Sequence, residues 1–146
     1  MVKKGSKNII RKENLVLLII PLIFIIDRTV KIYAVNGCFG QFCFSRALNN
    51  GAAFGILPGQ TVFLILIGIL VLLITLSIYK KSSSEIKLGL ILIAAGTISN
   101  MYDRIFFGSV VDVLSVFSSS SFNLADLSNL FGALILIKFL LARKKK

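Results

Sequence analysis

Four long apolar runs, separated by polar segments, dominate the pattern of the chain. They cover about residues 15–34, 61–79, 88–107 and 127–142. About 20 predominantly apolar residues are enough for an α-helix to cross the hydrocarbon core of a bilayer. The pattern therefore predicts a single membrane domain over residues 1–146, an all-α integral membrane protein built as a bundle of four transmembrane helices.

The loops between the runs differ in character. Residues 36–60 interleave turn-forming Gly and Pro with phenylalanines, a pattern typical of short strands and turns. Residues 117–123 are rich in serine and predict a polar turn before the last span.

Positive charge is distributed unevenly along the chain. Most of the 17 Lys and Arg residues lie in the N-terminal segment, in residues 80–87 and in the C-terminal tail, while the other two loops hold only Arg46 and Arg104. Because cytoplasmic loops carry an excess of Lys and Arg, both termini are predicted to be cytoplasmic, and loops 35–60 and 108–126 extracytoplasmic. The net charge of +11 then reflects topology, and no nucleic-acid partner is expected.

The first run has an alternative interpretation as a cleaved secretory signal peptide. Cations precede it, and Val35–Cys38 after it loosely resembles a lipoprotein cleavage box. However, the run is longer than the ~7–15 apolar residues of a typical signal peptide, and it contains Asp27, Arg28 and Lys31. A retained span is therefore favoured.

The amino-acid composition limits which side chains can serve in catalysis. An apolar content of 56% and a mean hydropathy of +0.90 argue against a soluble enzyme of this size. The chain has no His, which excludes imidazole catalysis, and its two Cys residues alone cannot complete a four-ligand zinc site. Carboxylates are left as the main candidates, and neither a metal nor an organic cofactor is expected.

The six acidic residues fall into two groups. Glu13 and Glu85 lie among cytoplasmic cations and are interpreted as solvated charges. The other four are predicted to lie near the outer ends of the spans, and ionisable groups at membrane depth suggest a functional site. These four are Asp27, Asp103, Asp112 and Asp126.

Two of these aspartates have cations close by in the sequence. Asp27 and Lys31 are one helical turn apart and are predicted to form an ion pair. Asp103 precedes Arg104, and a positioning ion pair is predicted there too, with Asn100 one turn away on the face of Asp103. A structural role is favoured for these acids.

Asp112 and Asp126 have no cation within a helical turn. One interpretation is structural, since Asn123 and Asp126 are spaced to cap the last helix. The other is catalytic: two carboxylates in a low-dielectric site cannot both ionise, so one serves as acid while the other activates water against a peptide carbonyl.

Four ordered blocks of sequence resemble those of signal peptidase II, the lipoprotein signal peptidase family. The blocks are residues 27–31, 49–55, 100–112 and 122–126. Any one block is a weak signal, but four in the right order are highly specific.

The resemblance implies an aspartic endopeptidase that removes the signal peptide from prolipoproteins carrying a diacylglyceryl-modified Cys, at the outer face of the cytoplasmic (inner) membrane of a prokaryote. It implies a four-helix membrane bundle with a small extracytoplasmic β-cradle, acting as a monomer among membrane lipids. By resemblance, Asp112 and Asp126 are the catalytic pair, and Asp27, Lys31 and Asp103 support the site. The residues in substrate-binding positions are Asn49, Gly51, Asn100, Arg104, Asn123 and Ala125.

The chain departs from the family pattern at a few positions. Ser99 precedes Asn100 where Gly is common, and Val113 follows Asp112 where Phe is usual. Cys38 and Cys43 lie outside the pattern. On the oxidising side of the membrane they can pair as a disulfide, or remain two buried or interfacial thiols.

Two rival functions come from other classes. A small multispan transporter or proton relay also places charges in its spans, but near the bilayer midplane and on broken helices. A structural pore subunit would explain the hydropathy but not two unpaired outward aspartates.

Overall fold

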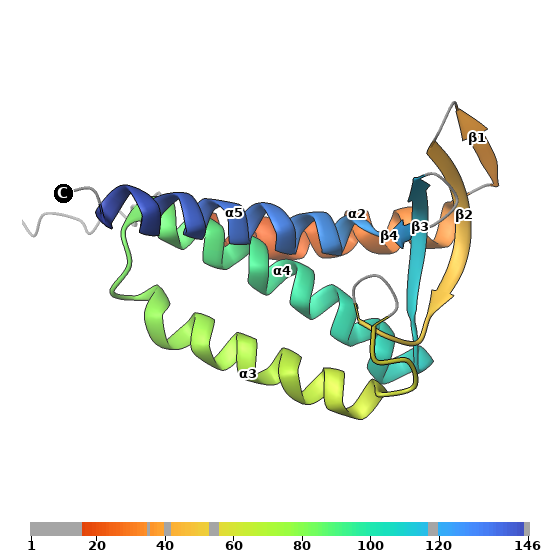
Figure 1. Cartoon of the computed structure of the whole chain (residues 1–146), viewed down its shortest axis with the longest axis horizontal. Helices are drawn as coiled ribbons and strands as arrows, with labels where there is room; N and C mark the ends of the chain where they lie inside the picture. Colours follow the sequence, from red (N-terminus) through yellow and green to blue (C-terminus); the bar gives the residue numbers. More distant parts are fainter. Residues whose placement is uncertain (1–15, 35, 40–41, 53–55, 117–119, 145–146) are drawn as a thin grey trace, which may run out of the picture.

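The computed structural model describes residues 16–34, 36–39, 42–52, 56–116 and 120–144. Helices make up most of this part, and a small sheet lies at one end (Figure 1). The helices are η1 (Val16–Leu18), α2 (Ile19–Tyr33), α3 (Thr61–Tyr79), α4 (Ser84–Phe107) and α5 (Leu124–Lys144).

α4 is the central helix, and α2, α3 and α5 all pack on it (Figure 1). The most extensive contact is between α4 and α5, and Gly89 and Gly132 face each other in it. A Cβ on Gly132 would lie 2.6 Å from the carbonyl oxygen of Gly89. Small residues allow such backbone contact, which is a common way for helices to pack in membranes.

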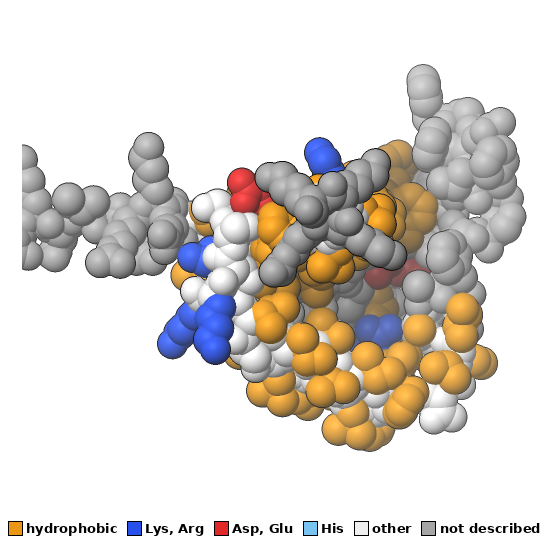
Figure 2. Space-filling view, turned by 60° about the vertical axis from the view of Figure 1, so that its left-hand side comes forward, with side chains coloured by type: hydrophobic (Ala, Val, Ile, Leu, Met, Phe, Trp, Pro, Cys, Tyr) orange, Lys and Arg blue, Asp and Glu red, His pale blue; other side chains and the backbone are white. Residues whose placement is uncertain are grey.

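The exposed surface of the helices is apolar. On α3, Val62, Leu66 and Leu76 expose more than half of their surface, and hydrophobic side chains cover the lower part of Figure 2, where α3 lies. By length and composition, three helices of the described part can cross a membrane: Thr61–Tyr79, Ser84–Phe107 and Leu124–Ala142. These agree with three of the four predicted spans.

The first predicted span folds differently from the others. It forms η1 followed by α2, and α2 has 15 residues, shorter than the other three helices. The helical part of the fold is therefore as predicted, while the fourth membrane crossing stays a prediction.

The sheet is antiparallel, with strand order β1-β2-β3-β4. The strands are β1 (Gly37–Phe39), β2 (Phe42–Asn49), β3 (Val110–Val116) and β4 (Ser120–Phe122). Strands were predicted in the first loop, but β3 was not predicted and β4 falls where a polar turn was predicted. The sheet therefore joins the two outer loops into one unit.

Cys38 and Cys43 form a disulfide across β1 and β2. The two residues are directly opposite each other in the strand register. Of the two states left open by the sequence, the structure has the disulfide.

Candidate active site

Asp112 lies in the middle of β3, opposite Ala47 of β2, and its side chain is fully buried. Neutral groups surround its carboxylate. Oδ2 accepts hydrogen bonds from Asn49 Nδ2 at 3.0 Å and from Ser121 Oγ at 3.3 Å. Oδ1 accepts one from Asn123 Nδ2 at 2.9 Å.

Asp126 lies in the first turn of α5 and takes part in the predicted helix cap. Asn123 Oδ1 accepts a hydrogen bond from the Asp126 amide at 2.9 Å, and Asp126 Oδ2 accepts one from the Asn123 amide at 3.2 Å. This reciprocal pair is a capping box, so the structural interpretation of Asp126 is confirmed. The other oxygen, Oδ1, accepts a hydrogen bond from Asn100 Nδ2 at 2.8 Å.

Asn123 connects the two carboxylates. Besides capping α5 beside Asp126, it donates from Nδ2 to Asp112, and the same nitrogen lies 3.2 Å from Asn100 Oδ1. Asp112 and Asp126 also interact electrostatically. The capping and catalytic interpretations of Asp126 are therefore compatible, because the cap places this carboxylate in one hydrogen-bond network with Asp112.

Arg104 and Gly51 hold the loop after β2 against α4. Arg104 Nη2 donates to the Gly51 carbonyl at 2.8 Å, and the Gly51 amide donates to Asn49 Oδ1 at 2.9 Å. Asn49 is thereby oriented with its Nδ2 toward Asp112. Through Asn49, this loop is tied to the same network.

A buried cluster of ion pairs lies between α2 and α4. Lys31 Nζ lies 2.6 Å from Asp27 Oδ2 and 2.8 Å from Asp103 Oδ2, and Arg28 pairs with both aspartates. The predicted Asp27–Lys31 pair is confirmed. The predicted Asp103–Arg104 pair is wrong: within the described residues Asp103 pairs with the cations of α2, because its side chain is directed toward that helix.

The ion cluster holds the backbone next to each candidate catalytic residue. Asp103 Oδ2 accepts the Val111 amide at 3.3 Å, and Asp27 Oδ1 accepts the Ala125 amide at 3.2 Å. Val111 and Ala125 directly precede Asp112 and Asp126. The cluster therefore ties both carboxylate-bearing segments to α2 and α4.

The structure shows further contacts of two residues in this region. Ala125, for which substrate binding stays a prediction, is fully buried and its backbone amide donates to Asp27. Ser99, noted only as a departure from the family pattern, donates to Asp27 Oδ2 at 2.5 Å. The signal that could have indicated this role is a polar residue within a membrane helix, one position before Asn100.

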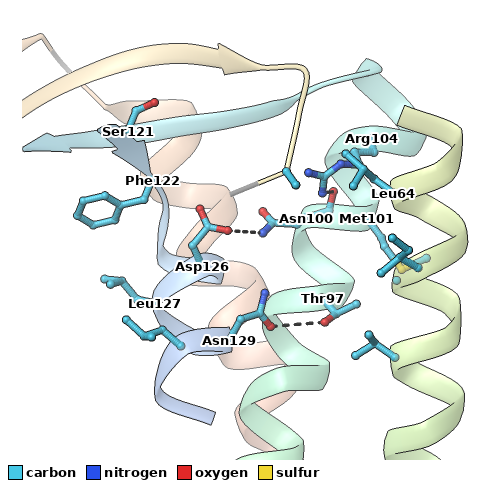
Figure 3. Close-up of a pocket in the computed structure, with 15 residues that line it drawn as sticks. Leu64, Thr97, Asn100, Met101, Arg104, Ser121, Phe122, Asp126, Leu127 and Asn129 are labelled. Carbon is cyan, nitrogen blue, oxygen red and sulfur yellow. Dashed lines mark hydrogen bonds between the residues drawn. The ribbon is translucent and has the colours of Figure 1, made fainter. Parts of the chain in front are cut away.

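A cavity of about 700 Å³ opens between α3, α4 and α5 next to this network (Figure 3). Asp126, Asn100 and Arg104 form its polar end. The rest of the wall is mainly apolar and includes Leu64, Ile67, Val71, Met101, Leu127 and Leu130. Asn129 and Thr97, which were not among the predicted site residues, also line it. Such a site suits a largely hydrophobic ligand with a few polar groups.

In the described part of the chain, no three His, Cys, Asp or Glu side chains come together as a metal site. The arrangement offers instead two carboxylates in a network of amides. Such a pair can share a proton and carry out acid–base chemistry.

Known proteins resemble this chain along most of its length. A family model described as signal peptidase (SPase) II matches residues 19–142. A lipoprotein signal peptidase of Clostridium novyi is 33% identical over 145 residues, covering 88% of this chain and 98% of that protein. A lipoprotein signal peptidase of Halothermothrix orenii is 34% identical and covers 90% and 98%, respectively.

Solved structures agree with the fold. A bacterial membrane enzyme superposes with a TM-score of 0.81 at 25% identity, covering 97% of this chain and 94% of that chain. A second bacterial membrane enzyme gives a TM-score of 0.74 at 26% identity, with 92% and 96% covered. The matched residues 19–142 include both aspartates and the whole network around them, and the chain belongs to the signal peptidase II family.

Proposed function

We propose that this member of the signal peptidase II family cleaves prolipoproteins with Asp112 and Asp126 as its catalytic pair. The observation that carries the proposal is the position of Asn123, which donates to Asp112 while it caps α5 beside Asp126. Asp126 lines the polar end of the cavity, and Asp112 lies buried behind it, joined to the same amide residue, so the two acids can act on the same bond. No metal or organic cofactor takes part.

The reaction needs the pair in a singly protonated state. The ionised carboxylate takes a proton from water, and the resulting hydroxide attacks the scissile carbonyl carbon. The protonated carboxyl donates its proton to the carbonyl oxygen, and the tetrahedral intermediate then collapses with a proton passing to the leaving amine. The amides of Asn49, Asn100 and Asn123 keep both acids in place.

The cavity supports a lipid-modified substrate. Its apolar wall between α3 and α5 suits the signal segment and the acyl chains, while Asn100 and Arg104 face the peptide near the scissile bond. The substrate would carry a diacylglyceryl-modified Cys directly after that bond, and the enzyme would work as a monomer surrounded by membrane lipids.

The membrane arrangement is part of the proposal. η1 and α2 together rise about 28 Å, close to the ~30 Å of a hydrocarbon core, so they are proposed as the fourth span. With both termini cytoplasmic, the sheet and the aspartates lie at the outer face of the cytoplasmic membrane of a prokaryote.

Cysteine labelling tests this topology. Gln60 and Ser83 are exposed and flank α3. With membrane-impermeant thiol reagents, Gln60→Cys should be labelled from outside and Ser83→Cys only after permeabilisation. The native cysteines are joined in a disulfide and provide the background control. The reverse labelling pattern would place the aspartates on the cytoplasmic side and refute the topology.

The activity itself is tested with purified protein in detergent. A synthetic lipopeptide with a diacylglyceryl-Cys should be cut on the amino side of that Cys, with a chelator present and no energy source. The same peptide without the lipid should be cut much more slowly. If the lipopeptide remains intact while the protein is folded, the proposed function is wrong.

A further inference from the structure

A second polar pair joins α4 and α5 deeper in the cavity than Asp126. Thr97 Oγ1 donates to Asn129 Oδ1 at 3.4 Å, and Figure 3 places this pair one helical turn below the hydrogen bond between Asn100 and Asp126. Asn129 follows Asp126 by three residues, which corresponds to about 4.5 Å along the helix axis. The cavity therefore has two polar levels on the same pair of helices.

The Asn129 side chain is held in place by the surface of α4. A Cβ on Gly96 would lie 2.6 Å from Asn129 Oδ1 and would clash with the Ala125 carbonyl. Only a residue without a side chain at position 96 lets the carboxamide lie against α4 in this way. Together with Thr97, this contact fixes the direction of the amide before any ligand binds.

The amide nitrogen of Asn129 faces the cavity without a partner. The bond to Thr97 uses Oδ1, and no described residue accepts a hydrogen bond from Nδ2. Its surroundings in the cavity are mainly apolar, with Leu127, Leu130 and Val71 in the wall. A donor left unpaired in such surroundings is unfavourable, and polar groups at membrane depth usually have partners. An acceptor on a bound ligand would remove this cost.

We propose that Asn129 is a substrate-binding residue whose Nδ2 donates to a carbonyl oxygen of the substrate, one helical turn deeper in the membrane than the catalytic pair. This inference rests on the proposed function. Lipid-modified prolipoproteins offer two sources of this chemistry, the backbone carbonyls of the signal segment and the ester carbonyls of the diacylglyceryl group.

The peptide backbone is the favoured source. A signal segment must be unwound where its bond enters the catalytic site, so its carbonyls there have lost their helical partners. In an apolar cavity such carbonyls need a donor. An extended chain rises about 3.3 Å per residue, so a donor about 4.5 Å below Asp126 reaches the carbonyl one or two residues before the scissile bond.

The test compares matched substrates in the full-length protein and in Asn129→Leu, which keeps the size and removes the donor. One lipopeptide carries normal amides, two carry a thioamide one or two residues before the scissile bond, and one has ether-linked chains. A thioamide sulfur is a weak acceptor and an ether has no carbonyl. Wild type should lose about tenfold in kcat/KM on a thioamide substrate, and Asn129→Leu should lose about tenfold on the normal substrate.

The decisive result is that the thioamide causes no further loss of kcat/KM in Asn129→Leu. Asn129→Leu should cleave the normal and thioamide substrates equally well, because the bond is already missing. If Asn129→Leu instead cleaves the normal and ether-linked substrates equally well, the acceptor is the ester carbonyl of the lipid, and Asn129 still binds a substrate carbonyl. If Asn129→Leu cleaves as wild type does, or loses the same factor on all substrates as a structural defect would, the inference is refuted.

Two further variants keep the test clear. Asn129→Ala replaces the Leu variant if that protein does not fold. Ser128→Ala removes a neighbouring α5–α4 bond, from Ser128 Oγ to the Leu92 carbonyl at 2.7 Å, outside the cavity lining. It should discriminate between amide and thioamide as wild type does. Failure of wild type to cut the normal lipopeptide would refute the proposed function itself, which separates the two outcomes.

Discussion

Two pairs of aspartates lie near the sheet, and they have opposite surroundings. Asp27 and Asp103 are buried with two cations, Lys31 and Arg28, so that their charges are balanced. Asp112 and Asp126 have only neutral donors within hydrogen-bond distance, and in the described part of the chain neither forms an ion pair. The same type of side chain therefore lies in two electrostatic environments, one with buried cations and one with neutral hydrogen-bond donors.

The difference separates structure from chemistry. Carboxylates that form ion pairs with buried cations are suited to joining helices, because losing one partner would leave an uncompensated buried charge. A pair held by amides keeps hydrogen bonds in either protonation state and can share one proton. The structural pair also supports the other, because it holds the amides of Val111 and Ala125.

The largest effect on cleavage is expected when Asp112 or Asp126 can no longer exchange a proton. Asp112→Asn or Asp126→Asn should lower kcat/KM on the lipopeptide by about 10³-fold or more, since the amide keeps the size but cannot act as acid or base. The unfolding temperature in detergent should change little. Glu85→Gln, at an exposed position on α4, is the matched control and should remain active. Substantial turnover in either variant would refute the catalytic assignment.

Removing a cation from the ion pairs of Asp27 and Asp103 should lower the stability of the fold instead. Lys31→Met leaves two buried carboxylates with Arg28 as their remaining cation, and the free energy of unfolding should fall by about 3 kcal/mol or more. The measurement is denaturant unfolding in detergent, with Lys138→Met on the exposed face of α5 as the control. A Lys31→Met protein that is inactive but as stable as wild type would mean that Lys31 takes part in the chemistry.

Local contacts of this region were predictable from the sequence, and distant ones were not. The Asp27–Lys31 pair and the Asn123–Asp126 cap depend on residues three or four positions apart, so helical spacing alone indicates them. Asp103 finds Lys31 from another helix, 72 positions along the chain, and no local pattern specifies that. The sequence suggested Arg104 only because it is adjacent.

The strand that carries Asp112 was missed for a related reason. Residues 110–116 contain four valines, which favour a strand, but the segment is short and lies between two membrane helices. Its partner β2 lies in the other outer loop, so the sheet forms only when the helices bring both loops together. Asp112 and Asp126 were paired from the sequence because neither has a cation within a helical turn, and the family resemblance supported that pairing.

The next largest effect is expected in the pH dependence of cleavage, which should report the protonation of Asp112 and Asp126. In the proposed mechanism only the singly protonated state of Asp112 and Asp126 is active, so kcat/KM should follow a bell with limbs that fall about tenfold per pH unit. The profile is measured on the lipopeptide in detergent, with unfolding checked at each pH. A rate that rises steadily to high pH would indicate a lone base and contradict the shared proton.

The smallest effect is expected at the far end of the same sheet, where a covalent bond rather than charge or amides holds the strands. The disulfide joins β1 and β2 opposite Ser115, about 10 Å along β3 from Asp112. Replacing both cysteines by serine should change kcat/KM less than about twofold, because the amide network around the aspartates does not depend on that end. The free energy of unfolding should fall by at most about 2 kcal/mol, since the closed loop is short. Activity and denaturant unfolding of the double variant are compared with those of wild type under reducing and oxidising conditions. A loss of activity as large as that of Asp112→Asn would show that the whole sheet, and not the amide network alone, sets the geometry of the catalytic pair.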